Sequence, residues 1–96
     1  MSEDFFAPPP FRAAEALVQL KRSLRGLPPL TERGDAFELH GKPVLELTLD
    51  AAVIAAQLAR RPAQAPDWDR FVLKNSADVR KLVDEVKKRL ERWTEE

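Results

Sequence analysis

The sequence predicts an α+β domain in two layers, with N- and C-terminal helices packed on one face of an antiparallel sheet of three or four strands. Two observations carry this prediction. Apolar residues recur at three- and four-residue steps near both ends of the chain, and they alternate with polar residues between those segments. The expected order is therefore helix, three strands, a short fourth strand in the larger version of the sheet, and a closing helix.

The first helix is expected from about Pro10 to Arg25. The three prolines at positions 8–10 favour an extended lead-in and a preset helical start. The apolar stripe of this helix comprises Phe11, Ala13, Leu17, Leu20 and Leu24. Gly26 is expected to end the helix as a left-handed cap, and the prolines at positions 28 and 29 to prevent its resumption.

The next segment, "GDAFELHGKPVLELTLD", is typical of a β-hairpin. A shift of one residue would turn every apolar side chain to the wrong face, so the parity of the pairing selects the turn. We expect a three-residue loop at positions 41–43 or an equivalent bulge. This loop gives the pairs Leu39–Leu45 and Phe37–Leu47, with Leu49 on the same face as Leu45 and Leu47.

This register has two consequences for polar positions. Pro43, which lacks an N–H donor, leaves the hydrogen-bonded ladder. Glu38 and Glu46 then face each other on the solvent side, a mildly destabilising pair.

Residues 51–60, "AAVIAAQLAR", are open to two interpretations. Their alanines and a potential N-cap at Asp50 favour a helix. Parity favours a strand, because a tight turn at Asp50-Ala51 places Ala52, Ile54 and Ala56 opposite Leu49, Leu47 and Leu45. A helix here would be apolar almost all round, which a small domain can scarcely bury. We therefore favour the strand and keep the helix as the alternative.

The stretch "ARRPAQAPDWDRF", residues 59–71, connects this segment to a short strand in "RFVLK", residues 70–74. Ser76 is expected to cap the last helix, with Asp78 in its first turn. The apolar stripe of this helix, which runs to about residue 93, comprises Val79, Leu82, Val83, Val86, Leu90 and Trp93.

Composition and length restrict the function classes. Ninety-six residues suffice for one core, so we expect a flexible Pro-rich segment at 1–10 and a single domain at 11–96. The chain has no cysteine, which excludes disulfides and thiolate chemistry. The first ten residues lack the basic and apolar regions of a signal peptide, and no apolar run is long enough to span a bilayer. A cytoplasmic protein is the expectation.

Catalytic and metal-binding motifs are not found. His40 is the only histidine, and its place before a turn is typical of an exposed residue without metal or catalytic partners. None of the three serines lies in a strand-to-helix elbow, and the three glycines form no phosphate-binding loop. Glu38 and Glu46 are the only carboxylates that the expected register pairs, and we interpret them as a solvated face. The sequence thus predicts no catalytic residue, no metal site and no cofactor.

Residues 59–71, called the strap below, have a structural and a ligand-binding interpretation. In the first, Pro62 and Pro66 stiffen a connection whose Trp68 packs on the core edge, and Asp67 and Asp69 offset nearby arginines. In the second, arginine forks grip an anion while Trp68 stacks a base. The residues of that speculative ligand patch are Arg60, Arg61, Trp68, Lys74, Arg80 and Lys81. We favour the structural strap, because two aspartates beside Trp68 would repel a phosphate backbone.

The segment "RRPAQAPDWDRFVLKNSADVRKLVDEVKKRLERW" resembles the C-terminal part of small, uncharacterised bacterial α+β proteins. The resemblance covers about a third of the chain and includes no catalytic motif. It implies a bacterial source and a strap shared with those proteins, and it implies no activity.

These observations favour a small non-enzymatic binding domain whose partner is a protein, another copy of the chain included. The expected state is a monomer or weak homodimer, and an uncovered edge strand such as "RFVLK" is the expected pairing surface. The alternative is weak single-stranded nucleic-acid or other anionic-ligand binding through the Arg60, Arg61 and Trp68 loop and the start of the last helix. Equal numbers of basic and acidic residues, 16 each, neither require nor exclude a nucleic acid.

Overall fold

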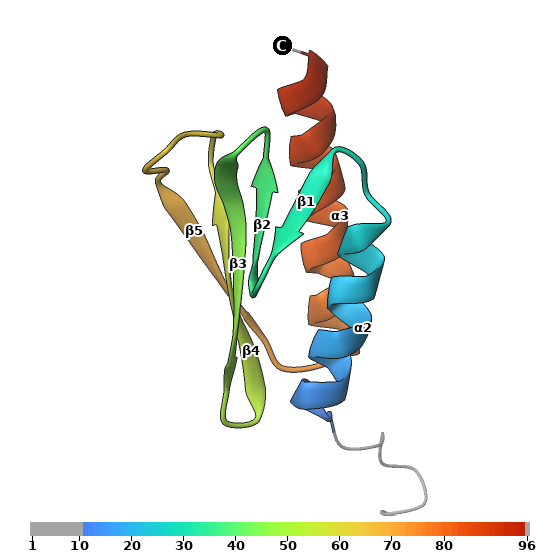
Figure 1. Cartoon of the computed structure of the whole chain (residues 1–96). Helices are drawn as coiled ribbons and strands as arrows, with labels where there is room; N and C mark the ends of the chain where they lie inside the picture. Colours follow the sequence, from blue (N-terminus) through green and yellow to red (C-terminus); the bar gives the residue numbers. More distant parts are fainter. Residues whose placement is uncertain (1–10, 96) are drawn as a thin grey trace, which may run out of the picture.

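The computed structural model describes residues 11–95, which form an antiparallel sheet with two helices on one side (Figure 1). The α+β arrangement is confirmed, and the sheet has five strands, one more than the larger expected version. The elements are α2 (Ala13–Arg25), β1 (Leu30–Arg33), β2 (Ala36–Leu39), β3 (Lys42–Asp50), β4 (Val53–Ala59), β5 (Trp68–Leu73) and α3 (Ser76–Glu95).

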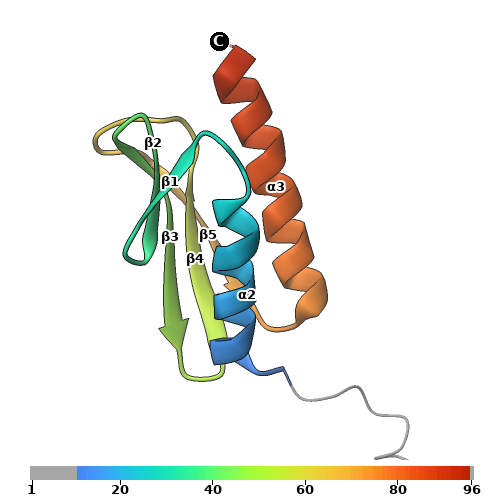
Figure 2. The ribbon, with the colours of Figure 1, turned by 45° about the vertical axis from the view of Figure 1, so that its right-hand side comes forward.

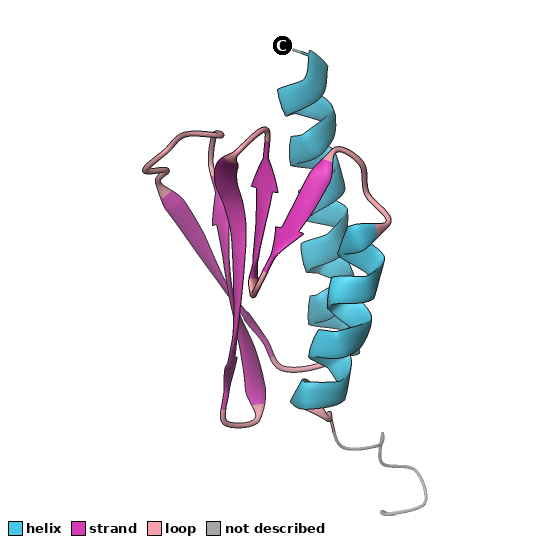
Figure 3. Cartoon of the chain, in the orientation of Figure 1, coloured by secondary structure: helices cyan, strands magenta, loops and turns pink. Residues whose placement is uncertain are grey.

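The sheet is a meander in which each strand pairs with the next, in the order β1-β2-β3-β4-β5. Both helices cover the same face, as the colouring by secondary structure makes clear (Figure 3). The helix α2 packs against β1, β3 and β4, whereas α3 packs against β5 and α2. The view turned by 45° shows the two helices side by side, with α2 nearer to β1 and α3 to the right of α2 (Figure 2). The other face of the sheet carries no helix among the described residues.

The core lies between the sheet and the helices and is built from every second residue of the central strands. Leu45 and Leu47 of β3 pair with Leu58 and Ala56 of β4, and all four are buried. The buried set comprises Ala13, Leu20, Leu24, Phe37, Leu39, Val44, Leu45, Leu47, Ile54, Ala56, Leu58, Ala59, Leu73, Leu82, Val86 and Leu90. Among residues 11–95 no polar or charged residue is buried, so the core is held by apolar contact alone.

The alanine-rich segment is a strand, as parity predicted, but its register is two residues from the expected one. The turn is formed by Ala51 and Ala52, with a positive φ of 53° at Ala51, and Leu49 therefore lies opposite Ile54. A slip of two residues keeps every side chain on its face, so parity alone could not detect it. The helix alternative for residues 51–60 is wrong.

The hairpin between β2 and β3 contains the bulge but not the three-residue loop. His40 and Gly41, with φ of 52° and 83°, form the turn, so Lys42 lies opposite Leu39. The register then shifts between Phe37 and Glu38, which leaves Val44 as the extra residue of the bulge and places Phe37 opposite Leu45.

The expected pairing of Glu38 with Glu46 across these strands is therefore wrong. Pro43 stays in the ladder opposite Glu38, and Glu46 lies opposite Ala36 on one side and Gln57 on the other. Glu38 forms an ion pair with Arg33 at 3.7 Å instead. No destabilising Glu–Glu pair arises across these strands, because the bulge changes the register.

The ends of both helices differ from the expectation. The first helix begins at Ala13, and Pro10 lies outside the described residues. Gly26 has a φ of −80°, so it is not a left-handed cap: the chain continues through tight turns in which Gly26 N–H donates to Ser23 O and Leu27 N–H to Leu24 O. The strand β1 then begins at Leu30, and no pattern predicted it because its four residues, "LTER", are too few to show one.

The cap of α3 is Asn75, one residue before the predicted Ser76. Its Oδ1 accepts the N–H of Asp78 at 2.9 Å, and the carboxylate of Asp78 accepts the N–H of Lys74 at 3.0 Å. These two reciprocal bonds satisfy donors at the helix start and fix the angle at which β5 leads into α3.

Replacement of Asn75 by Ala is expected to lower the free energy of unfolding by about 1 kcal/mol, because an N-cap acceptor is lost. Ser76→Ala is the matched control and is expected to change it by less than about 0.5 kcal/mol, as exposed substitutions do. Urea unfolding followed by circular dichroism measures both. An equal or larger loss for Ser76→Ala would assign the cap to Ser76 after all.

Candidate functional site

The middle of the strap lies outside the sheet, because the chain leaves the sheet at Arg60 and returns at Asp67. The N–H of Arg60 donates to the carbonyl of Asp67 at 2.9 Å, directly beyond the last strand pair, Ala59 with Trp68. Residues 61–66 therefore form a six-residue excursion whose two ends are held together by the ladder. The strap is a closed loop at one end of the sheet, shown at the top left of Figure 1.

The carboxylate of Asp69 connects the strap to α3. Its Oδ1 accepts from Arg60 Nε at 2.8 Å, and its Oδ2 accepts from Arg89 Nη2 at 2.9 Å. Arg89 also donates to the carbonyl of Ala59 at 3.0 Å and to Glu85 Oε2 at 2.9 Å. One arginine of α3 thereby contacts β4, β5 and its own helix.

This arrangement shifts the pKa of two groups. The hydrogen bond from Arg60, and then that from Arg89, hold the pKa of Asp69 below its ordinary value of 3.8. The hydrogen bond to Asp69 raises the pKa of Arg60. The Arg60 fork is thus engaged within the domain, which supports the structural interpretation of the strap over an anion grip.

Trp68 is partly buried and packs against the core cluster, at the edge expected for the strap. Its cross-strand partner is Ala59, which is fully buried. Because paired residues share a face, Trp68 lies on the helix-free face together with Arg70 and Val72, whereas Asp69, Phe71 and Leu73 face the helices.

The six residues of the speculative ligand patch do not form one surface. Arg60, Arg61 and Trp68 lie at the strap end of β5, and Lys74 follows the opposite end of that strand. Six residues of extended chain separate Trp68 from Lys74, roughly 20 Å. Arg80 and Lys81 lie in the first two turns of α3, which begins two residues after Lys74. The strand predicted at residues 70–74 already implies this separation, and the pairing of β5 with β4 over its whole length makes it explicit.

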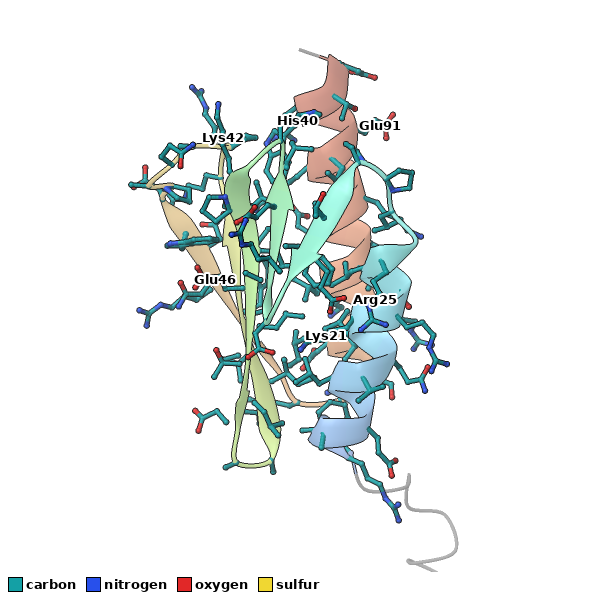
Figure 4. All side chains as sticks on the ribbon, viewed as in Figure 1. Lys21, Arg25, His40, Lys42, Glu46 and Glu91 are labelled. Carbon is teal, nitrogen blue, oxygen red and sulfur yellow. The ribbon has the colours of Figure 1, made fainter. Side chains whose placement is uncertain are left out.

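Two open hollows lie at the strap end of the molecule. The first, of 330 Å³, is lined by Arg60, Arg61, Ala63, Ala65, Pro66 and Asp67. The second, of 260 Å³, is lined by Leu39, His40, Lys42, Pro62 and Trp93. Figure 4 shows His40 and Lys42 at this end of the sheet. No sequence pattern identifies this second group, because its members come from a hairpin turn, the strap and the last turns of α3.

The strand β5 is an edge of the sheet, as expected for the "RFVLK" segment. Pairs in an antiparallel ladder alternate between hydrogen-bonded and non-hydrogen-bonded. The bond from Arg60 to Asp67 makes that pair hydrogen-bonded, so residues 69, 71 and 73 bond to β4. The main-chain N–H and C=O groups of Trp68, Arg70 and Val72 therefore point outward from the sheet edge.

The two edges of the sheet differ in their protection. The edge strand β1 has four residues, follows two prolines and is followed by Gly34, and Glu32 in it is tied to Arg25 of α2. In β5 the pairing with β4 continues without a bulge over six residues, and the strand contains no proline. Val72 exposes 52% of its surface. Short strands, prolines and bulges are the usual devices against strand addition, and β5 has none of them.

No group of three or more potential metal ligands occurs within residues 11–95, and no helix in that range could cross a membrane.

Asp69→Asn is expected to lower the unfolding midpoint at pH 7, because Arg60 and Arg89 lose their shared carboxylate. The folded pKa of Asp69 is depressed, so its stabilising effect is present above the unfolded value near 3.8 and is lost as the pH falls through the folded value. The difference in unfolding midpoint between the parent and Asp69→Asn should therefore disappear at acid pH. Thermal unfolding from pH 7 to pH 2 measures it, with Asp67→Asn as the control. A difference in unfolding midpoint that does not change with pH would contradict a stabilising role for the ionised Asp69 carboxylate.

Proline substitutions should reveal which main-chain N–H groups of β5 point outward and which bond to β4. A proline at position 72 removes an outward N–H and should cost about 1 kcal/mol or less beyond Val72→Ala, since edge strands accept proline there. A proline at position 71 removes an N–H bonded to β4 and leaves an acceptor unsatisfied, so it should cost roughly 2–3 kcal/mol beyond Phe71→Ala. Urea unfolding of the four variants measures both increments. A larger increment at position 72 than at position 71 would mean that the N–H of residue 72, and not that of residue 71, bonds to β4.

Comparison with known proteins leaves the family open: no family model matches the chain, and neither curated proteins nor solved structures give a significant match. The function must therefore be argued from the residues themselves.

Proposed function

We propose that this chain is a small, non-enzymatic binding domain that takes up an extended segment of a protein partner along the edge of β5. The observation that supports this most directly is the row of outward main-chain groups at Trp68, Arg70 and Val72. An added strand would satisfy those groups with hydrogen bonds, while its alternate side chains would meet the two faces of β5.

The side chains along β5 suit such a partner. On the helix-free face, the exposed part of Val72 and the partly buried Trp68 offer apolar contact. On the helix side, the partly buried Phe71 offers a second apolar contact. A partner strand with apolar residues on either face would gain from burial as well as from main-chain hydrogen bonds.

The alternative, binding of a single-stranded nucleic acid through Arg60, Arg61 and Trp68, has weaker support. Arg60 is engaged with Asp69, and the lysines and arginine of the other group lie at the far end of β5. Stacking on Trp68 and phosphate contact at Lys74 or Lys81 would require a strand that spans the whole edge.

The proposal of a non-enzymatic role rests on the carboxylates. Glu38 and Glu46, the pair that the sequence brought into question, are separated by the bulge, and Glu38 contacts Arg33 instead. Figure 4 shows Glu46 on the open side of β3, away from both helices. Glu38 is half-buried and tied to Arg33, whereas Glu46 is exposed, so the two carboxylates do not form the facing pair that a glycosidase-like site requires.

A library of random eight-residue peptides, displayed on phage and selected on the full chain, tests strand addition without a known partner. Val72→Pro is the informative variant, because proline removes an outward N–H and adds a ring at the edge. Val72→Ala is the matched control, because it keeps the N–H. Enriched peptides are expected to bind the parent and Val72→Ala, and to bind Val72→Pro at least about tenfold more weakly, a loss near 1.4 kcal/mol.

Amide spectra of the labelled chain locate the bound peptides. Shifts concentrated at residues 68–74 are the expected result. Peptides that bind Val72→Pro as tightly as the parent, or that shift only residues near the 260 Å³ hollow, would refute strand addition at β5.

A further inference from the structure

The 260 Å³ hollow at the strap end of the molecule brings together three segments that are distant in the chain. Leu39, His40 and Lys42 come from the hairpin between β2 and β3, Pro62 from the strap, and Trp93 from the last turn of α3. Apolar walls with a few polar groups are the usual composition of small-ligand sites. This hollow is called the tryptophan hollow below.

The apolar part of the tryptophan hollow is anchored in the domain. Leu39 belongs to the buried core, with 4% of its surface exposed. Pro62 and Trp93 are both partly buried, and Trp93 packs against the core cluster. The wall therefore exists before any ligand arrives, and its indole offers a planar surface on which another ring can pack.

Two exposed polar side chains, His40 and Lys42, complete the lining. Lys42 lies opposite Leu39 in the hairpin, so the two side chains share the face of the sheet that the helices cover. Trp93 approaches that same face from α3. Figure 4 shows His40 and Lys42 at the same end of the sheet. An ammonium and an imidazole thus stand beside an apolar wall.

The charge of this lining is positive. No carboxylate is among the described residues that line the tryptophan hollow, and Lys42 forms no ion pair within residues 11–95. By contrast, Asp67 lines the 330 Å³ hollow of the strap, and Asp35 and Glu46 line a third hollow, of 180 Å³. The tryptophan hollow is therefore suited to a ligand that brings its own negative group.

We propose that the tryptophan hollow binds a planar aromatic carboxylate. The ring of the ligand packs on Trp93 and Pro62. Its carboxylate accepts hydrogen bonds from Lys42 and His40, of which the bond from the lysine ammonium is charge-assisted. The volume of 260 Å³ lies below the range of about 300–1,000 Å³ typical of drug-sized ligands, which limits the ligand to one or two fused rings. This inference does not rest on strand addition, because none of these residues belongs to β5.

Other anions suit the tryptophan hollow less well. Inorganic phosphate would leave the apolar wall in contact with water. A nucleotide carries a ribose and a phosphate in addition to its base, which is too much for so small a volume. An aromatic carboxylate occurs both as a free acid and at the C-terminus of a protein whose last residue is aromatic, and the two sources call for separate probes.

Titration of the labelled full chain with 2-naphthoate, followed by amide and indole NMR spectra, tests the inference. 2-Naphthamide is the matched ligand, because it has the same rings without the charge. We expect a dissociation constant of about 1 mM or below for the acid, as suits so small a ligand, and binding of the amide that is about threefold weaker. Shifts are expected at Gly41, Lys42 and the Trp93 indole. The Trp68 indole, on the helix-free face, should not shift.

Lys42→Gln removes the charge and should weaken binding of 2-naphthoate by about threefold, while binding of 2-naphthamide stays unchanged. Lys74→Gln is the matched control at the far end of β5 and should change neither. Trp93→Leu should weaken both ligands alike, with circular dichroism to show that the variant is folded.

A substitution at position 40 tests the imidazole without disturbing the hairpin. His40 and Gly41, the two central residues of the turn, both have a positive φ, and asparagine followed by glycine is the sequence that such turns prefer. His40→Asn should therefore leave the unfolding midpoint unchanged or raise it. It should weaken binding of 2-naphthoate by about twofold or more, because a hydrogen bond to the carboxylate is lost.

The remaining outcomes are decisive in the same way. Absence of shifts at about 10 mM 2-naphthoate would refute the site, as would shifts of the same residues by inorganic phosphate alone. Equal binding of acid and amide would refute the role of the carboxylate. A tetrapeptide with a C-terminal tryptophan, as the free acid, identifies the source: tighter binding than 2-naphthoate assigns the site to a protein terminus, and weaker binding assigns it to a free acid. Val72→Pro should leave binding of 2-naphthoate unchanged, so this site and strand addition can fail separately.

Discussion

The alternation of apolar residues along β3 and β4 is the constraint on which the rest of the structure depends. Leu45, Leu47, Ala56 and Leu58 form one continuous buried row, and a slip of one residue would replace them with Glu46, Thr48 and Gln57. Both helices therefore cover the same face of the sheet. Over that face α2 lies toward β1 and α3 lies toward β5.

Sequence reasoning succeeded where a property depends on parity and failed where it depends on turn geometry. The strand character of residues 53–59 follows from the alternation of Ile54, Ala56 and Leu58. The two-residue slip at Ala51 does not, since Ala51 adopts a positive φ that alanine seldom takes and no pattern announces it. Likewise, the bulge at Val44 follows from parity, whereas the turn at His40 and Gly41 does not. The expected left-handed cap at Gly26 does not form, because the chain continues through tight turns at Gly26 and Leu27 before β1 begins at Leu30.

The candidate site was predictable in part. That β5 would be an edge strand followed from its position as the last strand of a meander. The outward direction of the main-chain N–H and C=O groups of Trp68, Arg70 and Val72 follows from one hydrogen bond, from Arg60 to Asp67. No sequence pattern reveals that bond. Both aspartates of the strap were expected to offset arginines. Asp69 does so for Arg60 of the strap and Arg89 of α3, whereas Asp67 forms no ion pair within residues 11–95.

The main-chain hydrogen bond that closes the base of the strap, from Arg60 to Asp67, also has a consequence for the engineering of this fold. The pairing of Arg60 with Asp67 holds the ends of the excursion independently of what lies between them. The entropy cost of closing a loop grows only slowly with its length. A reporter domain or affinity handle inserted at Ala63-Gln64 would therefore emerge from the end of the sheet while β4 and β5 stay paired. The strap is in this sense an attachment point, which can be lengthened without disturbing the accessible edge of the sheet.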